Sequence, residues 1–238
     1  MRLLVTRPQS ESERTAAALR ARGHEAVVAP LLRIEPVTGT AIDPQSVSAI
    51  LMTSANAARA VAAHPRLADI RHLPVLAVGR QTAEAARAVG FADVVSADGD
   101  AAALAALAVG RFGARAARLL YLAGSDRARD LAADLAPHGV SIETAVVYRA
   151  TAVETLPAEA RTALAASGLA GVLHYSARTA AIFVQCAARD GLIETVRGLA
   201  HYCLSRRVAQ ALHDAGFERV LVAARPDEAA MLDLLASS

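Results

Sequence analysis

The residues of this chain best suited to bind a ligand or take part in a reaction are small polar side chains and arginines that follow short apolar runs. They come directly after segments predicted as strands, and the carboxyl ends of parallel strands form the ligand-binding edge of an open α/β sheet. Helix N-termini at that edge carry free N–H groups, and arginine holds carboxylates through two parallel hydrogen bonds, so the set suits an anionic ligand. The candidate binding residues are Thr6, Arg7, Thr53, Ser54, Asn56, Gly79, Arg80, Gly124, Ser125, Tyr175, Ser176, Arg178, Ser205 and Arg206, with Thr82, Asp126 and Arg207 beside them.

Helix capping is the simpler explanation for each serine or aspartate in this set. Their side-chain oxygens accept hydrogen bonds from the first backbone N–H groups of a helix, which makes them good N-caps. Capping alone accounts for any one of them. The gathering of several helix N-termini at one edge is what indicates a ligand site.

The sequence excludes several familiar chemistries. All 25 basic residues are arginine, so no lysine exists to form a Schiff base or to bind phosphate in a P-loop. The first predicted strand is followed by TRPQSES, which lacks a glycine-rich dinucleotide loop, and no GxSxG motif occurs. The seven histidines are scattered, and Cys186 and Cys203 fit no metal or redox spacing. A net charge of +2 argues against nucleic acid as the main partner. We therefore expect no metal site.

The location of the protein is predicted from its apolar segments. No uncharged apolar run reaches 18 residues, which argues against a transmembrane helix. The N-terminal segment becomes polar within seven residues, so we expect a first strand there and no signal peptide. A cytoplasmic protein with reduced thiols is the expectation that follows.

Short aliphatic runs alternate with longer Ala-, Leu- and Arg-rich stretches of helical period, which predicts α/β architecture with parallel sheets. Gly23, Gly90, Gly139 and Gly216 stand where a helix should end before the next strand. Strands are predicted near 2–6, 25–29, 48–53, 74–78, 93–95, 117–122, 140–147, 171–175, 200–204 and 219–222. Helices are predicted near 10–22, 55–63, 80–89, 100–110, 127–136, 157–167, 176–188, 205–215 and 227–236.

The same order of segments occurs twice, which indicates an internal duplication. RLLVTRPQSESERTAAALRARGHE from Arg2 aligns with RLLYLAGSDRARDLAADLAPHGVS from Arg118, an offset of 116 residues. Two further pairs follow in the same order, one of which aligns Ser54 with Ser176. A duplicated chain of 238 residues predicts two similar domains of ordinary size.

The predicted domains are joined by two connectors, residues 31–38 and 146–152. LLRIEPVTG and VVYRATAVE are both extended in pattern and could pair as a two-stranded β-ladder. The first domain is then discontinuous, with residues 1–36 packing with 152–238, and residues 39–145 form the second domain.

An ordered set of segments resembles the uroporphyrinogen-III synthase family over essentially the whole chain. It comprises LLVTRPQSESERTAAALRARGHEAVVAPLLRIEPV at the start, LMTSANAARAV, VLAVGRQTAEAARAVGF, YLAG, VVYRA, YSARTA and ARPDEAAML. The resemblance implies two flavodoxin-like α/β domains joined by a two-stranded ladder, a substrate bound in the cleft between them, and no cofactor. The implied reaction closes the linear tetrapyrrole hydroxymethylbilane, which carries eight carboxylates, into uroporphyrinogen III. Loss of its hydroxyl gives an azafulvene cation, and a spiro intermediate then allows ring D to invert.

The same resemblance suggests two catalytic residues. The family's tyrosine in the return strand falls on Tyr148, and a threonine at a helix start falls on Thr82. The corresponding position of the other domain holds Val208, so the chain departs from the common threonine there. The serines of the TSANA and YSART turns fall on Ser54 and Ser176.

Two other functions stay open at this stage. One is a non-catalytic tetrapyrrole-binding regulatory paralogue, against which the absence of a DNA-binding extension counts. The other is a solute-binding protein, against which the expected lack of a signal peptide counts. We expect a monomer that binds a small-molecule tetrapyrrole and neither nucleic acid nor membrane. A transient contact with hydroxymethylbilane synthase stays open.

Overall fold

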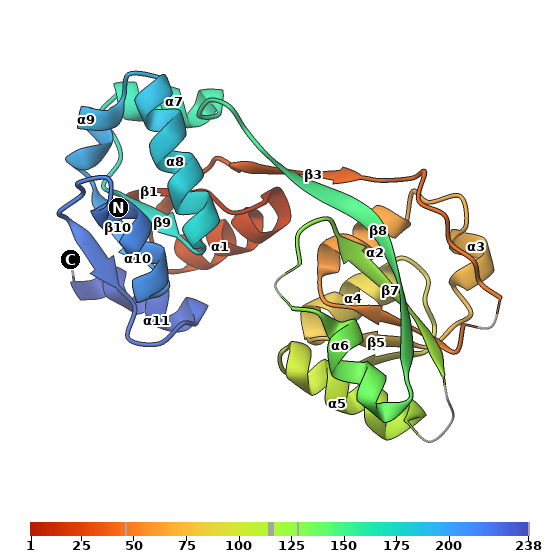
Figure 1. Ribbon diagram of the computed structural model, residues 1–238. Coiled ribbons are helices and arrows are strands. Elements are labelled where there is room, and N and C mark those ends of the chain that lie inside the picture. Colours follow the sequence, from red (N-terminus) through yellow and green to blue (C-terminus); the bar gives the residue numbers. More distant parts are fainter. Residues whose placement is uncertain (46, 114–116, 128, 238) are drawn as a thin grey trace. The chain divides into compact units, whose positions relative to one another are not determined.

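The computed structural model describes residues 1–45, 47–113, 117–127 and 129–237 (Figure 1). The chain forms two compact units: unit 1 is Met1–Arg33 with Thr151–Ser238, and unit 2 is Ile34–Ala150. The chain leaves unit 1 within β3 (Leu32–Pro36) and returns within β8 (Ser141–Ala152). The predicted division into domains of residues 1–36 with 152–238 and of residues 39–145 stays a prediction.

Unit 1 is built on a five-stranded parallel sheet in the order β11-β10-β9-β1-β2. Its strands are β1 (Arg2–Val5), β2 (Glu25–Val28), β9 (Gly171–His174), β10 (Ala200–Cys203) and β11 (Val220–Val222). Its helices are α1 (Gln9–Ala21), α7 (Ala158–Ala165), α8 (Ala177–Arg189), α9 (Ile193–Arg197), α10 (Arg206–His213) and α11 (Glu228–Asp233), with a final 3₁₀ turn, η2 (Leu234–Ser237).

Unit 2 contains a six-stranded sheet in the order β3-β8-β7-β4-β5-β6, in which β4 to β8 pair in parallel. Its strands, besides β3 and β8, are β4 (Ala49–Met52), β5 (Val75–Ala77), β6 (Val94–Ser96) and β7 (Arg118–Gly124). Its helices are α2 (Ala55–Val61), α3 (Leu67–Ile70), α4 (Arg80–Ala88), α5 (Ala101–Phe112), α6 (Leu131–Leu135) and the 3₁₀ turn η1 (Ala136–His138).

The inner strands β4, β5, β9 and β10 are buried along their whole length, which explains why they are mainly apolar rather than alternating. In unit 1, Leu3 and Val5 pack in the cluster that holds α1 and α11, whereas Leu4 packs with α7, α8 and α10. In unit 2, Ile50 packs with α2 and α4, and Leu51 packs with α5 and α6. Successive side chains point to opposite faces of a strand, so each sheet is the middle layer of three.

The expected mixed α/β fold with mainly parallel sheets is confirmed, and the strand orders agree with the predicted repeat. Under that alignment β9, β10, β11, β1 and β2 of unit 1 correspond to β4, β5, β6, β7 and β8 of unit 2. The orders β11-β10-β9-β1-β2 and β6-β5-β4-β7-β8 are then identical. The glycines predicted to end helices also do so. Gly23 and Gly90 adopt φ angles of +77° and +104°, which other residues rarely adopt.

The pairing of the two connectors agrees with the prediction, whereas two details of the helices differ from it. Connector 31–38 contains the strand β3, which lies beside β8 in Figure 1. Backbone bonds from Val37 to Val147 and from Val153 to Leu31 show that the two run antiparallel. Helix α6 begins after residue 130, because Asp130 caps it by accepting from the N–H groups of Ala132 and Ala133; position 128 of the predicted helix lies outside the described residues. The four- and five-residue helices α3 and α9 were not predicted. No helix among the described residues is long and apolar enough to cross a membrane.

Candidate functional site

Each sheet has one point where the strand order reverses, and open α/β sheets bind ligands there. In unit 2 the chain builds β4, β5 and β6 in one direction and then returns to add β7 on the other side of β4. In unit 1 the reversal lies between β9 and β1. The loops after β4 and β7, and those after β9 and β1, are therefore the places to look for a site.

A cavity of about 260 Å³ lies at the reversal point of unit 2. Four of the residues that the sequence singles out, Thr53, Ser54, Gly124 and Tyr148, line it together with Asp126. The rest of its lining comes from Ala101, Tyr121, Arg127, Arg129 and Leu131. Residues from the ends of β4 and β7 and from within β8 therefore converge on one space, as a ligand site requires.

Two hydroxyl groups meet in this cavity. The Thr53 Oγ1 lies 2.7 Å from the hydroxyl oxygen of Tyr121, and either can be the donor. The ring of Tyr121 packs in the core beside α5 and α6, which leaves its side chain only 5% exposed. Ser54 next to Thr53 caps α2, because its Oγ accepts from the N–H of Asn56 at 3.1 Å. Thr53 is thus fixed between a rigid strand and a capped helix, with its hydroxyl held by Tyr121.

Tyr148 reaches the cavity from β8. It is half-buried, and its ring packs against the core beside α2 and α4. Its carbonyl accepts from the N–H of Ser125 at 3.0 Å, which continues the pairing of β8 with β7. A phenol offers both a donor and an acceptor, so Tyr148 supplies the cavity with hydrogen-bonding capacity.

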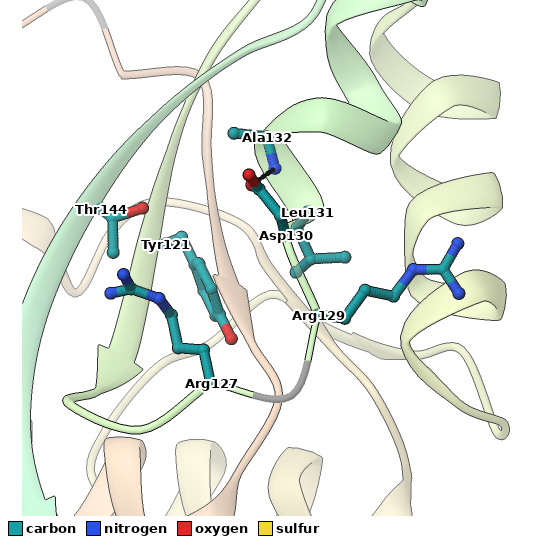
Figure 2. A pocket seen from close by; sticks show the side chains of 7 residues that line it. All are labelled: Tyr121, Arg127, Arg129, Asp130, Leu131, Ala132 and Thr144. Atoms are coloured by element: carbon teal, nitrogen blue, oxygen red, sulfur yellow. Dashed lines mark hydrogen bonds between the residues drawn. The ribbon is translucent and has the colours of Figure 1, made fainter.

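A second cavity, of about 280 Å³, shares Tyr121, Arg127, Arg129 and Leu131 with the first. Figure 2 shows the side chain of Arg127 on the same side as Tyr121 and Thr144, whereas Arg129 points away from them. No ion pair joins Arg127 to another side chain that the structure describes. Its guanidinium is therefore available to an anion that enters either cavity.

Arg129 differs from Arg127 because it has a partner. Its Nε and Nη2 lie 2.5 and 3.1 Å from the two carboxylate oxygens of Asp134. The hydrogen bond and charge of Asp134 raise the pKa of Arg129, and Arg129 in turn lowers the pKa of Asp134. This two-point ion pair holds Arg129 on α6, so Arg127 is the better candidate for binding a carboxylate.

The other candidate residues of unit 2 lie outside these two cavity linings. Gly79 precedes α4 as its N-cap, and the neighbouring Arg80 is 85% exposed, 3.7 Å from the Asp98 carboxylate. Thr82 is buried in the first turn of α4. Asn56 accepts a hydrogen bond from Arg59 through its side chain. The roles predicted for these residues, and for the exposed Ser125, stay predictions.

At the reversal point of unit 1, a carboxylate of the chain itself contacts the candidate residues. The Glu228 Oε1 accepts from Thr15 at 2.6 Å, from Arg7 at 3.3 Å and from the Tyr175 hydroxyl at 3.4 Å. The Arg7 guanidinium also lies over the Tyr175 ring, 4.2 Å from its centre. Thr6 beside it is fully buried and donates to the carbonyl of Leu173. A carboxylate of the chain thus takes the place where a ligand carboxylate would meet Arg7.

The environment of this cluster keeps its phenol protonated. Burial, and after it the negative charge of Glu228, raise the pKa of Tyr175 to about 12.

The other candidate residues of unit 1 lie at helix starts. Ser176 caps α8 by accepting from the N–H of Thr179 at 3.1 Å, and Ser205 precedes α10 without a side-chain cap bond. Arg178 and Arg206 are exposed. Unit 1 therefore presents the helix starts at Ser176 and Ser205, of which the first is capped by a side chain, together with the exposed Arg178 and Arg206.

Sequence reasoning missed two residues that the structure places at the centre of the site, Tyr121 and Arg127. Tyr121 lies inside the apolar run RLLYLAG and has the pattern of a core residue. Its contact with Thr53 depends on β4 pairing with β7, which the sequence does not reveal. Arg127 directly follows Asp126, the last candidate residue in the loop after β7. Including one more residue of that loop would have found it.

Comparisons with known proteins agree on one family. The family model described as uroporphyrinogen-III synthase HemD matches residues 13–233. The solved uroporphyrinogen-III synthetase of Helicobacter pylori 26695 is similar at 18% identity and a TM-score of 0.68, covering 100% of this chain and 99% of that chain. A mutant uroporphyrinogen III synthase of the extremely thermophilic bacterium Thermus thermophilus is similar at 16% identity and a TM-score of 0.53, covering 100% and 98%. At these identities the two structures show a shared fold. No curated protein matches the chain.

Proposed function

The chain belongs to the uroporphyrinogen-III synthase family, the hydro-lyases of porphyrin biosynthesis, and we propose that it runs the family's reaction at the unit 2 cavity. That reaction closes hydroxymethylbilane to uroporphyrinogen III with loss of water and inversion of ring D. The observation that carries the proposal is the convergence of Thr53, Gly124 and Tyr148 at the point where the strand order reverses.

The size of the cavities limits what they hold. Sites that enclose a whole drug-sized ligand measure about 300–1,000 Å³, whereas these measure about 260 and 280 Å³. Hydroxymethylbilane has four pyrrole rings and eight carboxylates, so each cavity suits one ring or one acidic arm. We assign the reacting end of the substrate to the cavity of Tyr148, and a neighbouring carboxylate arm to Arg127.

The side chains at this cavity match the first step of the reaction. A departing hydroxyl must take up a proton to leave as water, and a phenol or hydroxyl within hydrogen-bond distance can donate to it. Tyr148 and the Thr53–Tyr121 pair supply such groups. Arg127 contributes a fixed positive charge for an acidic arm. Spontaneous ring closure gives the uninverted isomer, so holding the chain in the productive geometry is a large part of the work.

The remaining expected binding residues fit a substrate with many carboxylates. Helix starts at Ser54, Ser176 and Ser205 present backbone N–H groups, and exposed arginines such as Arg80 and Arg178 add charge. We propose that these groups act together and that each contributes little alone, because solvent-exposed contacts are weak. We further propose that the protein works in the cytoplasm as a monomer. Thr82 is proposed as a second catalytic residue, as the family resemblance implies.

An isomer assay tests the proposed function. The purified chain is incubated with freshly generated hydroxymethylbilane, the products are oxidised, and the uroporphyrin isomers are separated. We expect isomer III, whereas a heat-denatured sample gives the isomer I of spontaneous closure. Isomer I from the native chain would contradict the proposal. Tight tetrapyrrole binding together with isomer I would point to a regulatory paralogue instead.

A further inference from the structure

The pairing of β7 with β8 contains one irregularity, and it falls at Tyr148. Ala123 pairs with Val146, but the next residue, Gly124, pairs with Tyr148, so β8 holds one extra residue at this point. Such a β-bulge bends the strand and re-aims the side chain that follows it. The irregularity therefore acts directly on the residue expected to face the substrate.

The packing of β8 shows what the bulge does. Ala145 and Val147 pack in the core beside α2 and α4, whereas Ile142 packs beside α5 on the other face. Strict alternation would send Tyr148 to the face of Ile142. Tyr148 instead packs against the cluster that holds Val147. The extra residue has turned the ring of Tyr148 toward the side of Val147.

Gly124 supplies the space into which the ring turns. A Cβ built on Gly124 would lie 2.6 Å from Cζ of Tyr148, 2.8 Å from its hydroxyl oxygen and 2.9 Å from Cε2. These three ring atoms are its nearest neighbours, and each distance is shorter than a Cβ tolerates. The φ of Gly124 is not positive, so an alanine there has no backbone strain. Among the described residues, the demand for glycine at this position comes from the ring of Tyr148.

We propose that Gly124 is the positioning residue of Tyr148. The bulge turns the ring of Tyr148, and the missing side chain of Gly124 leaves room for that ring at the cavity. This assigns Gly124 a role other than substrate binding. The inference rests on the proposed function only for its effect on catalysis, because the contact itself can be tested by stability.

The test is a cycle of four proteins: the wild type, Gly124→Ala, Tyr148→Ala and the double variant. In the wild-type background Gly124→Ala should push the ring aside, lower kcat at least tenfold with KM nearly unchanged, and lower Tm by about 5 °C. In the Tyr148→Ala background the same substitution should lower neither kcat nor Tm, because no ring remains to be displaced. Gly110→Ala is the matched control, since nothing lies within 4 Å of a Cβ there and no change in rate is expected.

Several outcomes overturn the inference. Gly124→Ala with full kcat would show that the ring position is irrelevant or unchanged. An equal fall of Tm in both backgrounds would show that the new methyl group clashes with something other than Tyr148. If Gly124→Ala alone fails to fold, recovery of folding in the double variant supports the contact, and failure of both refutes it. Loss of isomer III activity in the wild type would defeat the proposed function, while the Tm cycle would still decide the contact.

Discussion

Two histidines touch in the core of unit 1, and we predict that they make the protein sensitive to acid. The Nε2 of His174 lies 3.0 Å from Nδ1 of His201, and Nε2 of His201 lies 2.9 Å from the carbonyl of Val196. A carbonyl only accepts, so Nε2 of His201 must donate, and its Nδ1 then accepts from His174. The Nδ1 of His174 is left as a buried acceptor without a partner among the described residues.

The surroundings of the pair favour the neutral form of both rings. Both side chains are fully buried, Phe183 lies against His174 at 5.2 Å between ring centres, and Phe217 lies against His201 at 4.7 Å. Burial lowers the pKa of His201 to about 4, and burial together with the neighbouring His201 lowers the pKa of His174 well below 6.5. A proton added to Nδ1 of His201 would break the hydrogen bond from His174, and a proton added to Nδ1 of His174 would place a charge without a partner in the core.

The size of the effect follows from these values. In the unfolded chain both histidines take up a proton near pH 6.5, but in the folded chain they do not, so stability is complete above pH 6.5 and falls with acid. For His201 alone the loss approaches about 3 kcal/mol by pH 4. Between pH 6 and 4.5 the pair adds a slope of about 2–2.5 kcal/mol per pH unit, somewhat below the full value for two protons because the unfolded histidines are not fully protonated at pH 6 and His201 begins to take up a proton in the folded state near pH 4.5.

The assay compares the wild type with His174→Leu/His201→Leu, in which both partners are apolar and no buried polar atom is stranded. Unfolding in urea is followed between pH 4.5 and 7 by hydrogen exchange at the amides of β9 and β10, which reports unit 1. The difference between the two slopes should be about 2–2.5 kcal/mol per pH unit between pH 6 and 4.5, because the carboxylates contribute equally to both proteins. Equal slopes would refute the reasoning.

Two further predictions concern the charged groups. Arg127→Gln should raise KM about three- to tenfold, since its exposed guanidinium has no other partner among the described side chains; steady-state kinetics at two salt concentrations measures this, and the exposed Arg71→Gln is the control. An unchanged KM would remove Arg127 from the site. Glu228→Gln should lower Tm by about 2–4 °C, because it removes the charge that Arg7 and Thr15 meet. Thermal unfolding measures this beside Glu218→Gln, and equal Tm values for the two variants would show that the cluster is not stabilising.

Much of the fold follows from local patterns, whereas the pairing of strands does not. Aliphatic runs and helical periodicity are local, so the order of strands and long helices is readable. Short elements such as α3 carry too few residues for a period to appear. The pairing of β4 with β7 joins segments that lie far apart along the chain, which no local signal encodes. The ladder of β3 and β8 is the exception, because both connectors are extended in pattern and hold equivalent places in the repeat.

Some residues of the candidate site could likewise be predicted from the sequence, and others could not. Thr53, Ser54 and Gly124 were predicted because they follow or end strands, and Tyr148 was predicted from the family resemblance; the structure brings all four to one cavity. Tyr121 was missed because its ring is a core residue and only its hydroxyl reaches the cavity. The contact of Arg7 with Glu228 joins residues from opposite ends of the chain, so no local pattern indicates that Arg7 already has a carboxylate partner.

The rate of isomer III formation by Tyr148→Phe tests the central claim, that the family's reaction runs at the unit 2 cavity. The control is Tyr202→Phe, which removes a phenol from the core of unit 1 and should leave the rate unchanged. If Tyr148 orients or protonates the departing hydroxyl, the loss of its own hydroxyl should lower kcat by roughly ten- to a hundredfold. The upper value is where the effects of losing a general acid begin. Isomer III should still be the main product. A Tyr148→Phe enzyme that makes isomer III at the full rate would contradict the account.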